Sequence, residues 1–455
     1  MLQQEAVPAG VRVRRTSALP SWPVVALFVA FPLWWALGLS NFIGPILAAP
    51  MALALAVRGR VHVPRGFGIW LLFVFWMTAS AFKVDDTNRL IGWSFRAVVY
   101  LSATVLFLYV YNAPRQSLPV RRVALAMTAF WVVVVAGGYL GILFPEGGFR
   151  TVAENLMPGG LLTNSYVRDL VHVDFAQRAD PTRGLPTRPQ APFVYTNVWG
   201  SNFALLLPFV FIALPQLRRR LPQLLLLLVL VASLVPGFLS LNRGLWLSLG
   251  VGLIYAAMRY ALRGRVRAVA ALVLLLGMAL SLAIALPVQQ LLQESKNETT
   301  STRLALYRET IRKVQASPLL GYGAPRPSED TSGSTPSVGT QGQLWMVLFS
   351  HGFPGLALFL GWYVWVLWRS ARAQTGAQLW LHVVVLIALV QLPYYGMFPT
   401  GLPVFMVAAA VVLRELLEPD PQRRQAMALS DAATRAGLGA SWHHGQRGAG
   451  RGHQA

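Results

Sequence analysis

The sequence predicts an all-α polytopic membrane protein with about 12 transmembrane helices and two long external loops, the second of which carries an amphipathic helix. Three observations support this fold class: the composition, the lengths of the apolar runs and the charges between them. Of the 455 residues, 55% are hydrophobic and 12% are charged, whereas about a quarter of the residues of a soluble domain are charged. Most of the protein surface must therefore face lipid rather than water.

The apolar runs have the length that a bilayer requires. About 20 apolar residues in a helix cross a hydrocarbon core of roughly 30 Å. Tryptophan and tyrosine gather near the ends of several runs, as in Phe31–Trp35 and Gln391–Tyr395, which is typical of aromatic belts at membrane interfaces. The sequence contains twelve such segments, at 21–39, 41–57, 66–82, 93–112, 122–144, 192–216, 222–240, 244–262, 268–288, 341–368, 378–396 and 401–418.

The connections between these segments alternate in charge. By the positive-inside rule the basic connections are cytoplasmic, so both termini are expected to be cytoplasmic as well. This placement explains the net charge of +22 without nucleic acid as a partner. The basic regions contain Arg12/Arg14/Arg15, Arg58/Arg60/Arg65, Arg115/Arg121/Arg122, Arg218/Arg219/Arg220, Arg259/Arg263/Arg265/Arg267, Arg369/Arg372 and the basic tail.

The chain divides into three parts on this topology. Residues 1–20 form a cytoplasmic N-terminal segment, and residues 21–418 form the transmembrane domain with external loops 145–191 and 289–340. Residues 419–455 are rich in Gly, Ala and Arg and are expected to be a disordered cytoplasmic tail. The first apolar run is expected to remain as a span, because a second one follows almost at once without a small-residue cleavage site between them.

The second external loop contains a predicted amphipathic helix at 301–316, begun by a Thr/Ser cap and ended by Ser317-Pro318. Its apolar stripe is formed by Leu304, Tyr307, Ile311 and Val314, at spacings of three and four residues. This stripe is expected to lie on the membrane or on the outer mouth of the helix bundle. After the helix, Gly321-Tyr322-Gly323 is interpreted as a flexible turn back to the bilayer.

Arginines recur at the outer ends of the predicted spans, where the positive-inside rule does not require them. Arg188 precedes one outer helix start, Arg243 another, Arg303 opens the loop helix, and Arg96 lies near the outer end of a fourth segment. Helix N-termini and the planar guanidinium both favour phosphate-like anions. Asn197, beside one of these starts, has two interpretations, a helix cap or a ligand for a hydroxyl group.

Cations further along the loop helix have a simpler explanation. Arg308, Arg312 and Lys313 are expected mainly to pair with lipid phosphates or to cover apolar surface with their side-chain stems, although Arg308 and Arg312 remain candidates for substrate binding.

Four stretches in this order resemble the O-antigen ligase and polymerase superfamily. They are Arg188 to Gly200, the Leu239-Ser-Leu-Asn-Arg-Gly244 stretch, Ser301-Thr-Arg303 through Pro318-Leu-Leu-Gly-Tyr-Gly323, and Gln341 through Gly352-Phe-Pro-Gly355. The resemblance implies a multi-pass enzyme of the bacterial cytoplasmic membrane. It implies transfer of a glycan from an undecaprenyl-diphosphate-linked oligosaccharide donor to a glycan or other acceptor, at the outer face, amid membrane lipid and without a cofactor.

The sequence departs from the family pattern at two places. Gln341-Gly342 stands where the family has His-Asn, and Thr196-Asn197 stands where it has Pro-Asn. A glutamine does not titrate, so this position is expected to form hydrogen bonds rather than to transfer protons. His351 lies deeper in the same span and is interpreted as structural.

These features define the candidate site. We expect catalytic roles for Arg303, Arg243 and Gln341, and substrate-binding roles for Arg188, Asn197, Arg96, Arg308 and Arg312. Fixed guanidiniums would stabilise the charge on a leaving diphosphate without a metal ion. No metal site is predicted, because the chain has no Asp-x-Asp sequence and no cysteine.

Two questions remain open at this point. The outer acids available as a base are Glu309, Glu329, Asp330 and Asp174, and none of them is favoured. A 12-span transporter or flippase for an anionic or lipid-linked substrate is the alternative function. The scarcity of charged residues within the spans favours chemistry at the outer edge over passage through the bundle. The sequence does not separate a polymerase from a ligase.

Overall fold

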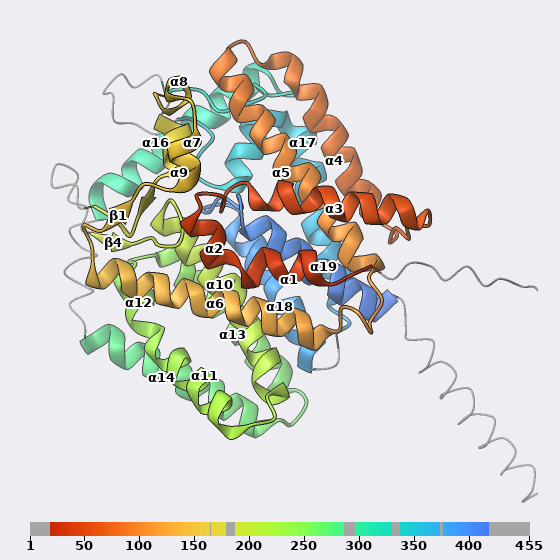
Figure 1. The fold of residues 1–455 in the computed structure, drawn as a ribbon, viewed down its shortest axis with the longest axis vertical. Helices are drawn as coiled ribbons and strands as arrows, with labels where there is room; N and C mark the ends of the chain where they lie inside the picture. Colours follow the sequence, from red (N-terminus) through yellow and green to blue (C-terminus); the bar gives the residue numbers. More distant parts are fainter. Residues whose placement is uncertain are drawn as a thin grey trace, which may run out of the picture.

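The computed structural model describes residues 19–163, 165–178, 187–285, 296–328, 337–373 and 376–417. The predicted tail at 419–455 and nearly all of the N-terminal segment at 1–20 lie outside the described residues. The described chain is mainly helical (Figure 1). Its long helices are α1 (Trp22–Val29), α2 (Phe31–Ala36), α3 (Ile43–Arg58), α4 (Phe67–Ala79) with the 3₁₀ turn η1 (Ser80–Lys83), α5 (Thr87–Asn112), α6 (Val120–Leu143), α10 (Thr196–Ala213) with η3 (Leu214–Gln216), α11 (Arg220–Ala232), α12 (Leu234–Leu239), α13 (Arg243–Ala261), α14 (Val266–Ala285), α17 (Gln343–Ser370), α18 (Gly376–Gln391) and α19 (Gly401–Leu417).

The two long loops contain the remaining elements. Two short antiparallel pairs, β1 with β2 and β3 with β4, shape the first loop, and one amphipathic helix dominates the second. These elements are β1 (Gly148–Phe149), α7 (Val152–Leu156), α8 (Gly159–Leu162), α9 (Ser165–Val171), β2 (Val173–Asp174), β3 (Ala176–Gln177), β4 (Arg188–Pro189) and α16 (Lys296–Ala316).

Each of the twelve predicted spans contains helix, although three of them are interrupted. Two consist of two helices each, α1 with α2 and α11 with α12, and α17 is interrupted at Gly352. Five helical segments among the described residues are long and apolar enough to cross a membrane by themselves. The mainly helical fold with candidate membrane-spanning helices is thereby confirmed, and the count of twelve spans stays a prediction. The five segments are Thr87–Asn112, Val120–Leu143, Thr196–Gln216, Arg220–Leu239 and Gln343–Ser370.

The basic connections and the two described ends of the chain share one face of the molecule. Arg122 donates to the Ser21 hydroxyl just before α1 (3.0 Å), and Arg115 pairs with Glu415 near the end of α19 (3.0 Å). The helices α7, α8, α9 and α16 and the strands β1 and β4 lie at the opposite side, on the left in Figure 1. The described parts of the two long loops therefore lie on the same face, and that this face is the outer one stays a prediction.

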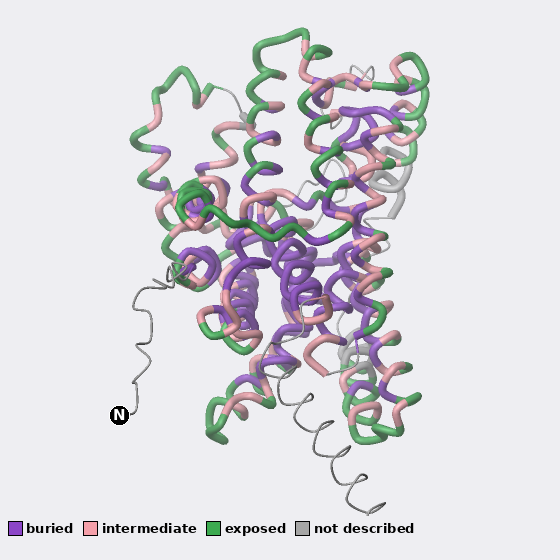
Figure 2. The backbone as a smooth tube through the Cα atoms, turned by 90° about the vertical axis from the view of Figure 1, so that its right-hand side faces the viewer, coloured by how far each residue is buried: buried purple, intermediate pink, exposed green. Residues whose placement is uncertain are grey.

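Burial is highest at the centre of the helix bundle (Figure 2). The central element is α19, which is buried from Gly401 to Arg414 and packs on α5, α10, α17 and α18. Large apolar side chains on the peripheral helices are exposed instead, for example Leu53 on α3 (66%), Phe75 on α4 (69%) and Leu228 on α11 (64%). Exposed apolar helix faces of this kind suit contact with lipid.

Candidate functional site

Arg188 is held at the outer face by a short strand pair. β4, which contains Arg188, pairs with β3, and the Arg188 Nη2 atom donates to the Gln177 side-chain oxygen across this pair (3.2 Å). The Nε atom of Arg188 is buried and has no partner. The guanidinium is therefore oriented by the loop but keeps donor capacity for a ligand.

Arg303 is held by α16, which packs against the outer end of α17. One turn beyond Arg303, the Tyr307 ring stacks on Trp345, with ring centroids 4.2 Å apart. The Tyr307 hydroxyl donates to the backbone oxygens of Gln341 (3.3 Å) and Pro393 (3.4 Å). Burial raises the pKa of Tyr307, and the Arg303 charge acts in the opposite direction. These contacts attach the part of α16 around Arg303 to the start of α17 and to the turn between α18 and α19.

The two arginines lie within electrostatic reach of each other and of Tyr395, in the turn between α18 and α19. Burial lowers the pKa of Arg188 to about 10, and the Arg303 charge adds to this effect, while Tyr395 opposes it. Among the described residues, neither arginine forms an ion pair with an acid. Two neighbouring guanidiniums in a partly dehydrated site repel each other, so an anion between them would be stabilised by both.

Arg243 begins α13, and the residue after it contacts the same turn. A Cβ atom added to Gly244 would lie 2.6 Å from the ring of Tyr394 and 3.0 Å from the ring of Tyr395. Arg243 is itself exposed. Three of the four arginine-bearing segments that the sequence singles out, those of Arg188, Arg243 and Arg303, therefore meet at one turn.

Asn242 fixes the start of α13 to the start of α10. Its side-chain nitrogen donates to the backbone oxygen of Thr196 (2.8 Å), so it does not cap its own helix. Gly200 permits this contact, because a Cβ atom there would lie 2.6 Å from the Asn242 nitrogen. The close approach explains the glycine, and it leaves the first N–H groups of α13 without a side-chain cap, which favours an anion nearby.

The remaining predicted site residues are more dispersed. Asn197 lies in the first turn of α10 and is not its cap, which excludes one of its two interpretations. Arg96 is half-buried on α5, with its guanidinium beside Gly92. Arg308 and Arg312 are exposed on α16, and the Gln341 amide donates to the Thr340 hydroxyl (3.3 Å).

The loop helix differs from the prediction in two respects. It begins at Lys296 rather than near Ser301. Its buried face consists of Leu306, Thr310 and Val314, whereas Leu304 (47%) and Ile311 (43%) are exposed. The predicted stripe is therefore divided: Val314 is buried, because α17 and the loop after α16 cover the side of α16 on which Leu306 lies, whereas Leu304 and Ile311 stay exposed.

The turn after α16 is fixed rather than flexible, which corrects the second expectation for this loop. α17 is interrupted at Gly352, whose backbone is not helical (φ 69°, ψ −171°). Tyr322 N–H donates to the Phe349 oxygen (2.9 Å) and Gly323 N–H to the Ser350 oxygen (2.8 Å). The segment 318–323 thus fills the break in α17 and satisfies backbone groups that the helix leaves without partners.

His351 lies at this break and is buried. Its Nδ1 atom lies 2.7 Å from the Ser80 hydroxyl, which donates to the Met77 oxygen (2.6 Å). The Trp76 indole donates to the backbone oxygens of His351 (3.0 Å) and Leu319 (3.1 Å). These contacts agree with a structural role for this histidine.

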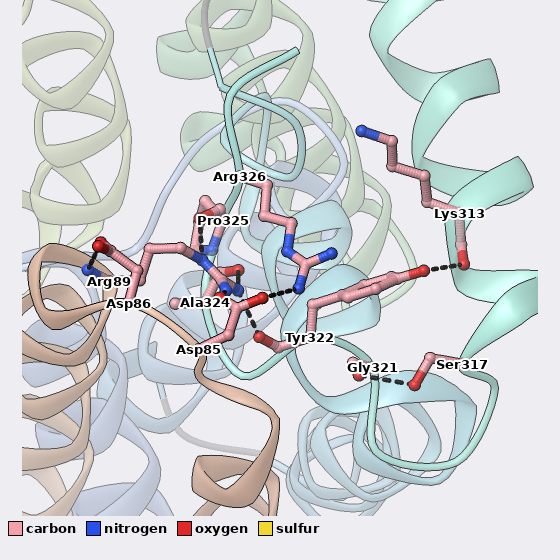
Figure 3. A network of polar contacts seen from close by, with 10 residues as sticks. All are labelled: Asp85, Asp86, Arg89, Lys313, Ser317, Gly321, Tyr322, Ala324, Pro325 and Arg326. Atoms are coloured by element: carbon pink, nitrogen blue, oxygen red, sulfur yellow. Dashed lines mark hydrogen bonds and ion pairs between the residues drawn. The ribbon is translucent and has the colours of Figure 1, made fainter. Parts of the chain in front are cut away.

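A second polar network attaches the same segment to the start of α5 (Figure 3). Arg89 donates to the backbone oxygens of Tyr322 (2.6 Å), Ala324 (2.8 Å) and Pro325 (3.2 Å), and also pairs with Asp85. Asp85 pairs in turn with Arg326, whose guanidinium lies over the Tyr322 ring at 4.4 Å. The Tyr322 hydroxyl reaches the Lys313 oxygen of α16 (2.9 Å). We name the set Asp85, Arg89, Tyr322 and Arg326 the loop clamp.

Replacing Arg89 should loosen the loop clamp. Lysine would keep the charge but not the planar fork that contacts three carbonyls and a carboxylate, so Arg89→Lys and Arg89→Ala should behave alike. We expect hydrogen exchange of a peptide covering 318–326 to accelerate about tenfold in either variant, which corresponds to about 1.4 kcal/mol of local stability. Arg308→Ala on the exposed side of α16 is the control and should leave this exchange unchanged. Unchanged exchange in Arg89→Ala would show that the clamp does not hold the segment.

The outer acids do not approach the arginine site as a group. Glu309 pairs with Lys313 (2.9 Å) and accepts from the Ser328 hydroxyl (2.8 Å). Asp174 lies 3.8 Å from His172 in the first loop. Glu329 and Asp330 lie outside the described residues.

Residues 228–360 match the family model described as O-antigen ligase. This stretch confirms the resemblance to the O-antigen ligase and polymerase superfamily, and it includes Arg243, Arg303 and Gln341. A comparison with curated proteins gives no match.

The O-antigen ligase match supports glycan transfer of the ligase or polymerase type in general. Together with the apolar helices it indicates a bacterial inner-membrane protein. Arg188, Arg96 and Asn197 lie before the matched stretch. Tyr395 lies after it, and its contact with the arginines comes from the fold alone.

Two parts of the candidate site could not be found from the sequence. In the sequence, Tyr394 and Tyr395 are interpreted as part of an aromatic belt at the membrane interface. Their position in the site follows only from the packing of Gly244 against their rings. Arg89 lies in the first turn of α5, and no motif in the sequence marks it. The Asp85-Asp86 pair before Arg89 is the sequence feature that could have indicated its role, because acidic residues near a helix start can pair with a neighbouring cation.

Proposed function

We propose that this protein transfers a glycan from an undecaprenyl-diphosphate-linked donor to a hydroxyl group of an acceptor glycan or other molecule, at the outer face of the bacterial cytoplasmic membrane. The observation that carries the proposal is the pair Arg188 and Arg303, two neighbouring guanidiniums without an acid partner among the described residues. A diphosphate is the anion whose charge and oxygen geometry such a pair fits best.

In the proposed step the acceptor hydroxyl oxygen attacks the anomeric carbon of the donor sugar. The bond between that carbon and the diphosphate oxygen breaks, and the bonding electrons leave with the diphosphate. Arg188 and Arg303 stabilise the negative charge that develops on the leaving oxygen, because they are fixed before the reaction and partly shielded from water. The hydroxyl proton passes to solvent or to the departing diphosphate.

The other residues have supporting roles in this proposal. Arg243, at the start of α13, binds the second phosphate. Gln341 and Asn197 hold sugar or acceptor hydroxyls by hydrogen bonds, and Arg96 attracts the donor headgroup. Arg308 and Arg312, on the exposed face of α16, attract anionic lipid or donor before it binds.

The test is transfer by the purified protein in lipid nanodiscs, with an undecaprenyl-diphosphate-linked oligosaccharide as donor. We expect release of undecaprenyl diphosphate and a matching longer glycan, with the same rate in the presence of EDTA because the arginines replace a metal ion. A rate that falls with EDTA and returns with Mg²⁺ would contradict the assignment of this role to the arginines. Movement of the intact donor across proteoliposomes, without cleavage, would support the transporter alternative and overturn the proposal.

A further inference from the structure

Tyr395 carries a buried hydroxyl group that the fold does not use. The residue lies in the turn between α18 and α19 and is only 3% exposed. Its hydroxyl group has no hydrogen-bond partner among the described residues. A buried polar group without a partner lowers the stability of a folded protein, and phenylalanine would fill the same space without that loss. The hydroxyl group therefore indicates a partner that binds from outside the chain.

The backbone on both sides of Tyr395 is fixed. The Tyr395 N–H donates to the Gln391 oxygen (2.9 Å), and the Tyr395 carbonyl oxygen accepts from the Gln343 N–H at the start of α17 (2.8 Å). The Gln343 side-chain oxygen accepts from the Met397 N–H (2.9 Å), two residues further along the same turn. The position of the Tyr395 ring is thus set before a ligand binds, which is what catalysis by a preorganised hydrogen-bond donor requires.

The Tyr395 ring lies against the start of α13. A Cβ atom added to Gly244 would lie 3.0 Å from the ring carbon that carries the hydroxyl group. The Leu245 N–H approaches the hydroxyl oxygen, but it already donates to the Asn242 oxygen (3.1 Å). Since an N–H group is itself a donor, the hydroxyl proton of Tyr395 has no acceptor among the described residues. This proton is therefore available to a ligand.

The positive charges of Arg188 and Arg303 both act on the Tyr395 hydroxyl group. Three tyrosines in the described part of the chain have a buried hydroxyl group without a partner, and neither arginine acts on the other two, Tyr363 and Tyr394. Guanidiniums attract anions, and an O–H group forms a short, strong hydrogen bond with an anionic oxygen. The ligand that completes this site therefore accepts a hydrogen bond and carries negative charge.

We propose that the Tyr395 hydroxyl group is a catalytic hydrogen-bond donor to the diphosphate oxygen that leaves the sugar. This inference rests on the proposed function and adds a neutral donor to the two guanidiniums. As the acceptor oxygen bonds to the anomeric carbon, the bond from that carbon to the diphosphate oxygen breaks, and its electron pair stays on this oxygen. The hydroxyl proton stays on Tyr395, and its hydrogen bond strengthens as the oxygen gains charge.

Tyr395→Phe removes the hydroxyl group and keeps the ring. We expect kcat to fall about 10- to 100-fold, as for a lost hydrogen bond to a charged group. The KM for the lipid-linked oligosaccharide should change less than about twofold, because the leaving oxygen is still bonded to the sugar in the bound substrate. In the product this oxygen is charged, so the Kd for undecaprenyl diphosphate should rise about tenfold. Turnover and microscale thermophoresis of the purified protein in nanodiscs measure these values.

Tyr363→Phe is the matched control. Tyr363 also has a buried hydroxyl group without a partner, but it lies on α17 and its ring stacks on Phe405, with centroids 3.9 Å apart. This variant should keep the wild-type kcat, KM and Kd. Both variants should unfold at the wild-type temperature or slightly above it, because each loses a polar group that bonds to nothing in the fold. Equal losses of kcat in the two variants would overturn the proposal.

Three other results would also overturn the role of Tyr395. The first is a Tyr395→Phe variant with unchanged kcat and unchanged affinity for undecaprenyl diphosphate. The second is a raised KM for the acceptor without a change in this affinity, which would place Tyr395 at the acceptor. The third is a lower unfolding midpoint with activity lost in proportion to folded protein, which would make the residue structural. In each case the wild type still releases undecaprenyl diphosphate, whereas failure of the proposed function would abolish that release in the wild type itself.

Discussion

Arg188→Ala and Arg303→Ala should each reduce the kcat of glycan transfer by about a hundredfold to a thousandfold, at normal protein levels. In comparable sites, loss of one preorganised donor that stabilises developing charge raises the activation free energy by about 3 to 4 kcal/mol. Arg188 and Arg303 act together on the same leaving group, so the double variant should be little worse than either single one. The measurement is single-turnover transfer with the undecaprenyl-diphosphate-linked donor.

Two substitutions sharpen this comparison. Arg303→Lys should recover little activity, because an ammonium group does not form the paired hydrogen bonds of a guanidinium. Arg308→Ala is the matched control, an arginine on the exposed side of the same helix, and should lose less than about threefold, as surface charges usually do. If Arg303→Ala and Arg308→Ala were equally active, the arginine pair would be a surface feature and the proposed function would lose its support.

Gly352→Ala should destabilise the membrane domain by about 4 kcal/mol or more. The backbone at Gly352 adopts a conformation that only glycine accepts readily, and an added Cβ would overlap the carbonyl oxygens of Pro318 and Leu319. The loop segment would have to leave the break in α17 to make room. Thermal unfolding of the solubilised protein, followed by tryptophan fluorescence, should show a much lower midpoint.

Gly361→Ala provides the control within the same helix. The added Cβ there would lie 3.4 Å from Ile69, an ordinary contact, and the backbone is helical. This variant should unfold at the wild-type temperature or slightly above it, since alanine favours helix. Equal unfolding midpoints for the two variants would mean that the packing of the segment 318–323 into the break of α17 does not contribute to the stability of the protein.

The helices were predictable because their signals are local. A run of apolar residues with basic residues at every second connection needs no knowledge of distant contacts, and each predicted span contains helix. The anion site was predictable only in part. Arg188, Arg243 and Arg303 could be singled out one by one, because arginine at an outer helix start is unusual.

Their convergence was not predictable, because it depends on packing between segments far apart in the chain. Tyr395 lies about 90 residues beyond Arg303 and more than 200 beyond Arg188, and the contact follows from how α13, α16 and α18 pack. The same reason applies to α16. Its exposed and buried faces depend on which side α17 and the loop after α16 cover, and the spacing of Leu304 and Ile311 carries no information about that.

The interruption of α17 limits how this chain can be recombined with a related one. The oxygens of Phe349 and Ser350 are hydrogen-bonded by the segment at 318–323 rather than by their own helix. A graft that exchanged the external loop alone would leave backbone acceptors unsatisfied inside the bilayer, where no water can replace the lost partner. The loop and the first half of α17 therefore form one exchangeable unit, and a viable chimera would have its junction beyond residue 353 rather than at the membrane surface.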